Sequence, residues 1–184
     1  MKTLLCDLVT DIRMLFRVPV SAFFTVVFPS LMLIIMMASY GNPDIGSGIR
    51  LSDKYVLIAS GMGLVPLSLI TFPSWICSSV ESSYLLRLKY LHVSLARVAT
   101  SNALAHMVIA LCGTAVTFAV GVLFYDTRIP GLPALIAYSL QLIVVTASLM
   151  LFGAALAFIV RQTAVVIAVG LVLMFVVYML CGVF

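Results

Sequence analysis

Charged residues are scarce in this chain of 184 residues: only 9% are Asp, Glu, Lys or Arg, whereas 64% are hydrophobic. A soluble domain is typically about a quarter charged and near half apolar. So few charges cannot cover the surface of a water-soluble globule. The composition therefore indicates an all-α integral membrane protein, and the absence of a linker or a repeat indicates one transmembrane domain over residues 1–184.

Residues for metal or redox chemistry are also missing in any useful pattern. The four cysteines, Cys6, Cys77, Cys112 and Cys181, lie far apart in apolar surroundings and form no CxxC pair. A metal or disulfide framework would need closer or regular spacing. We interpret the cysteines as small packing residues and expect no metal site and no cofactor in this chain.

Nucleotide and hydrolytic chemistry lack their motifs as well. No GxxxxGK[ST] phosphate loop occurs, so any ATP and Mg²⁺ that drive this protein must be bound by another polypeptide. A nucleophile with its base, or two facing carboxylates, cannot be assembled from Glu81, His92 and His106. We therefore expect no enzymatic activity. The basic residues do not alternate with aromatic ones, so we expect no nucleic-acid partner.

What the chain does have is a set of long apolar stretches. A helix needs about 20 apolar residues to cross the hydrocarbon core. Away from their ends these stretches hold no Asp, Glu, Lys or Arg, and we interpret their one histidine, His106, as a packing residue. Ion coupling, and with it a secondary transporter, is therefore not expected. The stretches predict five spans, at about 19–40, 55–80, 98–124, 134–160 and 163–184.

The basic residues predict the orientation, because Lys and Arg accumulate in cytoplasmic loops. With residue 1 inside, seven of them fall on the cytoplasmic side and three outside. We expect a multi-pass protein of the plasma (inner) membrane with a cytoplasmic N-terminus. The inner group is Lys2, Arg13, Arg17, Arg87, Lys89, Arg97 and Arg161, and the outer group is Arg50, Lys54 and Arg128.

The first 17 residues have a polar and an apolar helical side, which is typical of a helix lying in the membrane interface. A simple charged flank of the first span is the alternative. The polar side holds Thr3, Asp7, Thr10, Asp11, Arg13 and Arg17, and the apolar side holds Leu4, Leu5, Leu8, Ile12, Leu15 and Phe16.

Between the second and third stretches lies the segment 81–97, ESSYLLRLKYLHVSLAR, which is unusually charged for this chain. The orientation makes it cytoplasmic. Because the spans carry no coupling chemistry, we expect this segment to bind a partner that supplies energy. Its acidic start, leucines and basic residues predict a short helix.

These features together resemble the membrane subunit of ABC-2-type transporters. The resemblance rests on the N-terminal helix, the entry RVPVSAFFTVVFPSLMLI, the glutamate that closes the second span, ESSYLLRLKYL and the final CGVF. It implies that 81–97 is the coupling helix that docks on a separate ABC ATPase. The residues it implicates are Glu81, Leu85, Arg87, Lys89, Tyr90 and His92.

The resemblance also implies an export permease that forms its substrate path as a homo- or heterodimer. This chain departs from the family pattern in two ways. His92 stands where many members have a proline. The sixth span of the family is missing, so we expect a truncated chain. The alternative is a non-transporting membrane scaffold or assembly protein. Possible substrate-path residues are Asn102, Thr117, Gln141 and Thr146, for which helix packing is the competing interpretation.

Small residues and prolines add detail to the expected packing. Gly113, Thr117 and Gly121 form a small-residue face, and Gly153 with Ala157 forms another, either for packing within one bundle or for a subunit interface. Backbone groups released by prolines must find partners in neighbouring helices or in water. The prolines and glycines concerned are Pro29, Gly61, Gly63, Pro66 and Pro73.

Overall fold

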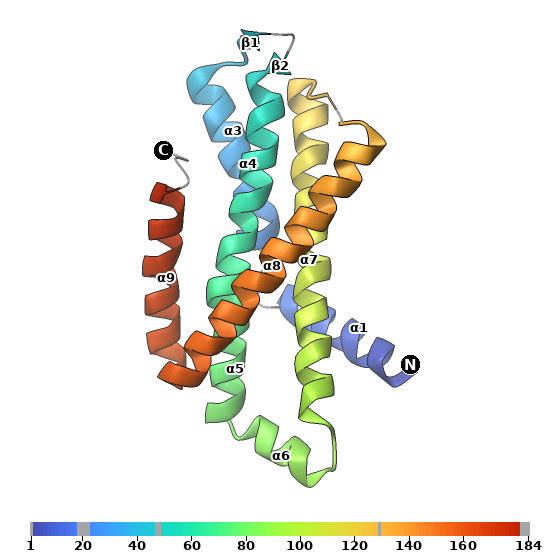
Figure 1. The fold of residues 1–184 in the computed structure, drawn as a ribbon, viewed down its shortest axis with the longest axis vertical. Helices are drawn as coiled ribbons and strands as arrows, with labels where there is room; N and C mark the ends of the chain where they lie inside the picture. The colour runs from blue at the N-terminus through green and yellow to red at the C-terminus, as the bar shows by residue number, and fades with distance from the viewer. Residues whose placement is uncertain (1, 18–22, 47–48, 129, 181–184) are drawn as a thin grey trace.

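The computed structural model describes residues 2–17, 23–46, 49–128 and 130–180, and this part of the chain is almost entirely helical (Figure 1). The expected all-α class is confirmed, apart from one short hairpin. The elements are α1 (Lys2–Arg17), η1 (Phe23–Val27), α3 (Phe28–Tyr40), β1 (Asp44–Gly46), β2 (Ile49–Arg50), α4 (Leu51–Pro66), η2 (Leu67–Thr71), α5 (Phe72–Glu81), α6 (Tyr84–Tyr90), α7 (Leu95–Tyr125), α8 (Leu132–Val160) and α9 (Thr163–Leu180).

Among the described residues, four helices are long and apolar enough to cross a membrane, which fits an integral membrane protein. They are the continuous helix Leu51–Glu81, then α7, α8 and α9. The expected first span at 19–40 is described only from Phe23 on, and its apolar helix Thr25–Tyr40 is shorter than the other four. Residues 181–184, which contain the CGVF terminus, lie outside the described residues.

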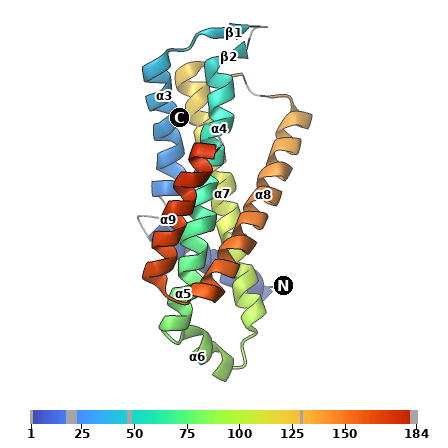
Figure 2. The same ribbon diagram turned by 60° about the vertical axis from the view of Figure 1, so that its left-hand side comes forward.

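The helix Leu51–Glu81, made of α4, η2 and α5, is the centre of the bundle. In its most apolar stretch 67% is buried, compared with 28% in α7 and 22% in α8 and in α9. The two views place α3, α7, α8 and α9 around it (Figures 1 and 2). Its Leu64 and Leu67 pack with Ala110 of α7 and Leu142 of α8. Most of α7, α8 and α9 is therefore left exposed, and their buried residues lie where they pack against neighbouring helices.

Two prolines shape the central helix because they cannot donate a backbone hydrogen bond. Pro66 has no N–H for the carbonyl of Met62, four residues earlier, and Tyr178 of α9 donates its hydroxyl to that oxygen instead at 2.6 Å. Between Pro66 and Pro73 the chain widens into the π-helical turn η2. Such wide turns inside α-helices often occur at functional positions.

Glycines of neighbouring helices lie against the carbonyls around η2. Pro73 has no backbone N–H to donate. The carbonyl of Leu69, which is four residues earlier as in an α-helix, and that of Ser68, five residues earlier as in a π-helix, therefore receive no hydrogen bond from it. A Cβ on Gly170 of α9 would lie 2.5 Å from the Leu69 oxygen, and one on Gly153 of α8 would lie 2.5 Å from the Ser68 oxygen. Only glycine allows this approach, so the small-residue positions pack inside the bundle.

The hairpin β1–β2 closes one end of the bundle, which we call the hairpin end; the opposite end, at α6, we call the α6 end (Figure 1). Arg50 donates to the carboxylate of Asp126 at 3.3 Å and so links the hairpin to the loop after α7. Asp53 accepts from the backbone N–H of Arg50 at 3.0 Å and of Arg128 at 2.8 Å. These contacts tie the hairpin to the loop after α7, and the helix of the second expected span begins at Leu51 rather than at 55.

Candidate functional site

The α6 end carries the segment predicted to bind a partner, and it projects beyond the rest of the bundle (Figure 1). Large apolar side chains are exposed there: Leu86 by 56%, Tyr90 by 78% and Leu91 by 72%. Leu85 and Leu88 are half-buried on the other side of α6. The structure therefore places a helix at 84–90, and the remainder of the predicted segment belongs to α5, to two turns and to α7.

Basic side chains accompany this apolar surface. Arg87, Lys89 and His92 are exposed. Leu86, Lys89, Tyr90 and His92 line a surface pocket of about 290 Å³. Among the described residues the ion pairs are Arg50–Asp126 and Arg97–Asp7, so neither Arg87 nor Lys89 has an acidic partner there. The tip of the α6 end is thus apolar and positively charged.

Left-handed residues bound α6 on both sides. Ser83, just before the helix, has a φ of 57°, and His92, two residues after it, has a φ of 56°. Non-glycine residues seldom adopt this conformation, and it turns the chain sharply. His92 therefore supplies the turn that returns the chain to α7.

Glu81, the last residue of α5, is held by the start of α9. One carboxylate oxygen accepts from the backbone N–H of Thr163 at 2.8 Å, and the other accepts from its hydroxyl at 2.7 Å. The first N–H groups of a helix have no partner within the helix, and they favour a negative charge. Glu81 therefore caps α9, and its role in binding a partner stays a prediction.

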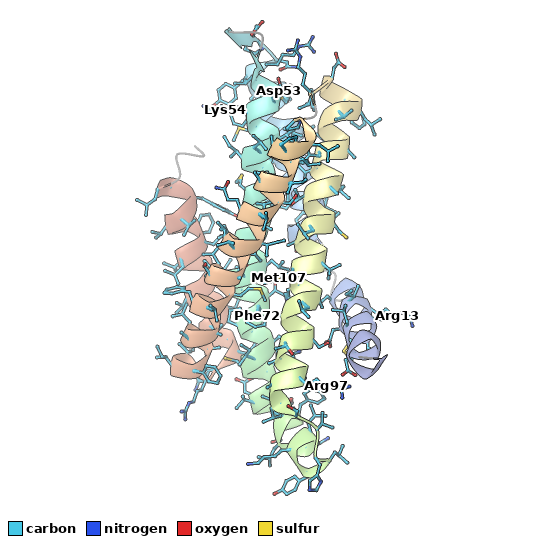
Figure 3. The ribbon with its side chains drawn as sticks, turned by 45° about the vertical axis from the view of Figure 1, so that its right-hand side comes forward. Arg13, Asp53, Lys54, Phe72, Arg97 and Met107 are labelled. Carbon is cyan, nitrogen blue, oxygen red and sulfur yellow. The ribbon has the colours of Figure 1, made fainter. Side chains whose placement is uncertain are left out.

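Helix α1 is tied to α7 close to the same end. Arg97 donates from Nε to the carboxylate of Asp7 at 2.8 Å and pairs with it through a second nitrogen. One turn further along both helices, Ser101 donates to Asp11 at 2.7 Å. Both contacts join residues 90 positions apart, so two successive turns of α1 meet two successive turns of α7. Figure 3 shows α1 beside the lower part of α7.

The apolar side of α1 supports the same contact, since Leu8, Ile12 and Leu15 pack against Ala105 and Ile109 of α7. Part of the side expected to lie in lipid is therefore covered by the protein. In Figure 3 Arg13 extends from the side of α1 away from α7.

The Asp11 carboxyl lies in an unfavourable environment for a charge. Burial raises its pKa above the usual range, the hydrogen bond from Ser101 partly offsets that effect, and the nearby charge of Asp7 adds to it. Burial disfavours the ionised form of a carboxyl, whereas a donated hydrogen bond favours it. The α1–α7 contact is therefore sensitive to the protonation of Asp11.

The four predicted substrate-path residues are not brought together in one cavity of the described residues. Asn102, Thr117 and Thr146 are buried, whereas Gln141 lies on the exposed side of α8. Thr117 donates its hydroxyl to Gly113 O at 3.0 Å, and Thr146 donates to Leu142 O at 2.6 Å. Each hydroxyl thus donates to a backbone carbonyl of its own helix, and a role of these residues in a substrate path stays a prediction.

His106 packs as the sequence suggested. It is fully buried, its Nδ1–H donates to Asn102 O at 2.8 Å, and its ring meets that of Phe72 edge-on at 5.5 Å. Its Nε2 has no partner within the described part of the chain, and the same holds for Oδ1 of Asn102.

Sequence reasoning missed several residues at the α6 end. Thr163 is the partner of Glu81, and the only signal was its place just before an apolar stretch, where helix-capping residues are common. Leu86 and Leu91 are exposed, which followed from no pattern in the sequence. In the described ranges, no group of three or more His, Cys, Asp or Glu side chains could hold a metal ion.

Comparison with protein-family models, curated proteins and solved structures found no match for this chain. Its function is therefore inferred from its own sequence and geometry.

Proposed function

We propose that this chain is the membrane permease subunit of an ATP-driven exporter of the ABC-2 type. A separate ABC ATPase, which binds ATP and Mg²⁺, docks on the segment 81–97. A second permease copy completes the substrate path as a homo- or heterodimer. The chain itself carries no ATPase site and acts as a transport subunit.

The observation that carries this proposal is the exposed surface of the α6 tip. Leu86, Tyr90 and Leu91 are more than half exposed beside Arg87 and Lys89. Apolar side chains on an outer face of the spans are solvated by lipid, but a tip that projects beyond the spans meets water. A contiguous apolar patch in water marks an interaction surface. The basic residues favour a partner with an acidic rim.

Two contacts could carry a movement of the tip into the bundle. Glu81 joins the end of α5 to the start of α9 through both hydrogen bonds from Thr163. Arg97, at the start of α7, is paired with Asp7 of α1. A partner that moves α6 would therefore act on α9 and on α1 together.

The proposed topology keeps five spans, with the segment 19–40 as the first and α1 as an interfacial helix. The α6 end is cytoplasmic in this arrangement, because Arg87, Lys89, Arg97 and Arg161 all lie close to it and basic residues accumulate on that side. The membrane is the plasma (inner) membrane.

Charge reversal at the tip tests the docking proposal. We would co-express the His-tagged chain with an ABC ATPase and compare the native form with the double variant Arg87→Glu/Lys89→Glu. The matched control is Lys54→Glu/Arg128→Glu, which makes the same change of charge at the hairpin end. We expect the ATPase to co-purify with the native chain and the control and to be lost from the tip variant.

Retention of the ATPase by the tip variant would remove 81–97 as the docking segment. ATP-dependent export from vesicles holding chain and ATPase tests the other half of the proposal. Binding of the ATPase without export in the native pair would favour the scaffold function.

A further inference from the structure

A groove separates α7 and α8 in the half of the bundle towards the hairpin end. The two helices meet near the middle of the bundle and diverge from there to the loop that joins them (Figures 1 and 2). The groove has a volume of about 720 Å³ and is lined from Leu111 to Leu123 on α7 and from Leu135 to Ser139 on α8. This volume lies within the range of about 300–1,000 Å³ found for small-molecule sites.

Small side chains and one long strut create this space. Ala115 and Ala119, one turn apart on α7, line the groove with single methyl groups. Tyr138 of α8 reaches past α7 to the central helix, where its hydroxyl donates to Leu57 O at 3.0 Å and contacts the Ser60 hydroxyl. Its ring meets that of Phe118 edge-on at 6.0 Å. Tyr138 thus fixes α8 to α4 while α7 and α8 stay apart.

The hydroxyl groups that line the groove already donate hydrogen bonds to backbone carbonyls of the protein. Thr114 donates to Ala110 O at 3.0 Å, Ser139 donates to Leu135 O at 2.8 Å, and Tyr138 donates to the central helix. No charged residue is among the lining residues. A polar ligand would lose its own hydrogen bonds on entering such a lining, whereas a hydrocarbon loses none. The lining therefore selects an apolar occupant.

The length and place of the groove identify that occupant. Both walls belong to helices long and apolar enough to cross a membrane, so the groove opens into hydrocarbon. The 12 residue steps from Leu111 to Leu123 rise by about 18 Å at about 1.5 Å per residue. One leaflet supplies about half of a hydrocarbon core of about 30 Å. The groove therefore matches the reach of one lipid chain from one leaflet.

We propose that this groove is a binding site for an acyl chain of a bilayer phospholipid, which enters sideways and fills the gap between α7 and α8. The bound chain supports the diverging end of α8, which otherwise depends on the Tyr138 strut. This site is independent of the ATPase and of transport, so its test needs neither.

A cavity-filling variant tests the site. Ala115→Phe places a ring in the groove, and Ala155→Phe makes the same change at an exposed position of α8 outside it. Each purified chain would be placed in nanodiscs containing a phosphatidylcholine with a diazirine on one acyl chain, irradiated and mapped by mass spectrometry. We expect crosslinks enriched at 111–123 and 135–139 in the native chain and in Ala155→Phe, and their loss in Ala115→Phe.

Thermal stability in detergent gives a second readout, because a ligand that binds the folded state raises Tm. Added phosphatidylcholine should raise the Tm of the native chain and of Ala155→Phe but leave that of Ala115→Phe unchanged. Crosslinks spread evenly over the exposed faces of α7, α8 and α9 would overturn the proposal. The proposal would also be overturned if the native chain and Ala155→Phe form a dimer and Ala115→Phe does not, since a second copy of the chain would then fill the groove.

Discussion

Tyr178 donates its hydroxyl to the backbone carbonyl of Met62 over 2.6 Å, and this contact supplies the hydrogen bond that Pro66 cannot make. It fastens α9 to the central helix at a buried position, since Tyr178 is only 4% exposed. The bond joins residues that are 116 positions apart in the sequence.

Tyr178→Phe should therefore destabilise the bundle. The variant keeps the ring but leaves the Met62 carbonyl without a donor, and side-chain hydrogen bonds between membrane helices contribute about 0.6–2 kcal/mol. Reversible unfolding in SDS and detergent mixtures measures the change. Tyr40→Phe, at a position 65% exposed, is the control and should leave the midpoint unchanged.

Gly153→Ala should be destabilising because its new methyl group would lie 2.5 Å from the Ser68 carbonyl and 3.1 Å from the ring of Pro73. Overpacking of this kind costs about 1–3 kcal/mol. Gly61→Ala is the matched control, since a Cβ there meets nothing within 4 Å. The control should gain up to about 1 kcal/mol from helix propensity. Equal effects of the two changes in the same unfolding assay would contradict the close approach.

Glu81 and Thr163 should behave as one energetic unit. Glu81→Ala removes both hydrogen bonds to the start of α9, and Thr163→Ala removes the one from the hydroxyl. Loss of a helix cap destabilises the helix that it closes. The double variant should therefore cost less than the sum of the single ones, as a double-mutant cycle can measure. Strict additivity would show that the two side chains do not interact in solution.

Asp11 should make stability depend on pH. Because burial raises the pKa of its carboxyl in the folded chain, Asp11 contributes stability at low pH that is lost as the pH rises through that raised pKa. Asp11→Asn keeps an oxygen for Ser101 and removes the charge. At pH 7 the variant should therefore be as stable as the native chain or more so, and this advantage should vanish near pH 4. A pH series of Tm values for both chains measures the crossover.

Much of the helical layout followed from the sequence. The four long helices lie within a few residues of their predicted spans, because a continuous apolar stretch and the polar residues that end it are local properties. The second span was predicted to begin at 55, four residues after the start of its helix at Leu51, because the charged residues Arg50, Asp53 and Lys54 interrupt the apolar stretch. The Asp53 carboxylate instead accepts from the backbone N–H of Arg50 at 3.0 Å, and this contact begins α4.

The pairing of distant groups could not be predicted in the same way. Apolar composition marks which residues avoid water but not which neighbour covers them, since lipid and protein are equally apolar. Nothing in the order of residues therefore indicated that Asp7 meets Arg97 or that Glu81 meets Thr163. The groove between α7 and α8 is likewise set by Tyr138, whose hydroxyl finds a carbonyl 81 residues away.

The carbonyls that the prolines leave in the central helix bear on the order in which the membrane fold assembles during synthesis. An unpaired backbone group in hydrocarbon costs several kcal/mol. Met62 O receives its hydrogen bond from Tyr178 and therefore waits for α9, the last helix in the described part of the chain. Gly170 of the same helix packs against Leu69 O. The earlier helices can enter the membrane first, but the central one reaches its final environment only after α9 has left the ribosome.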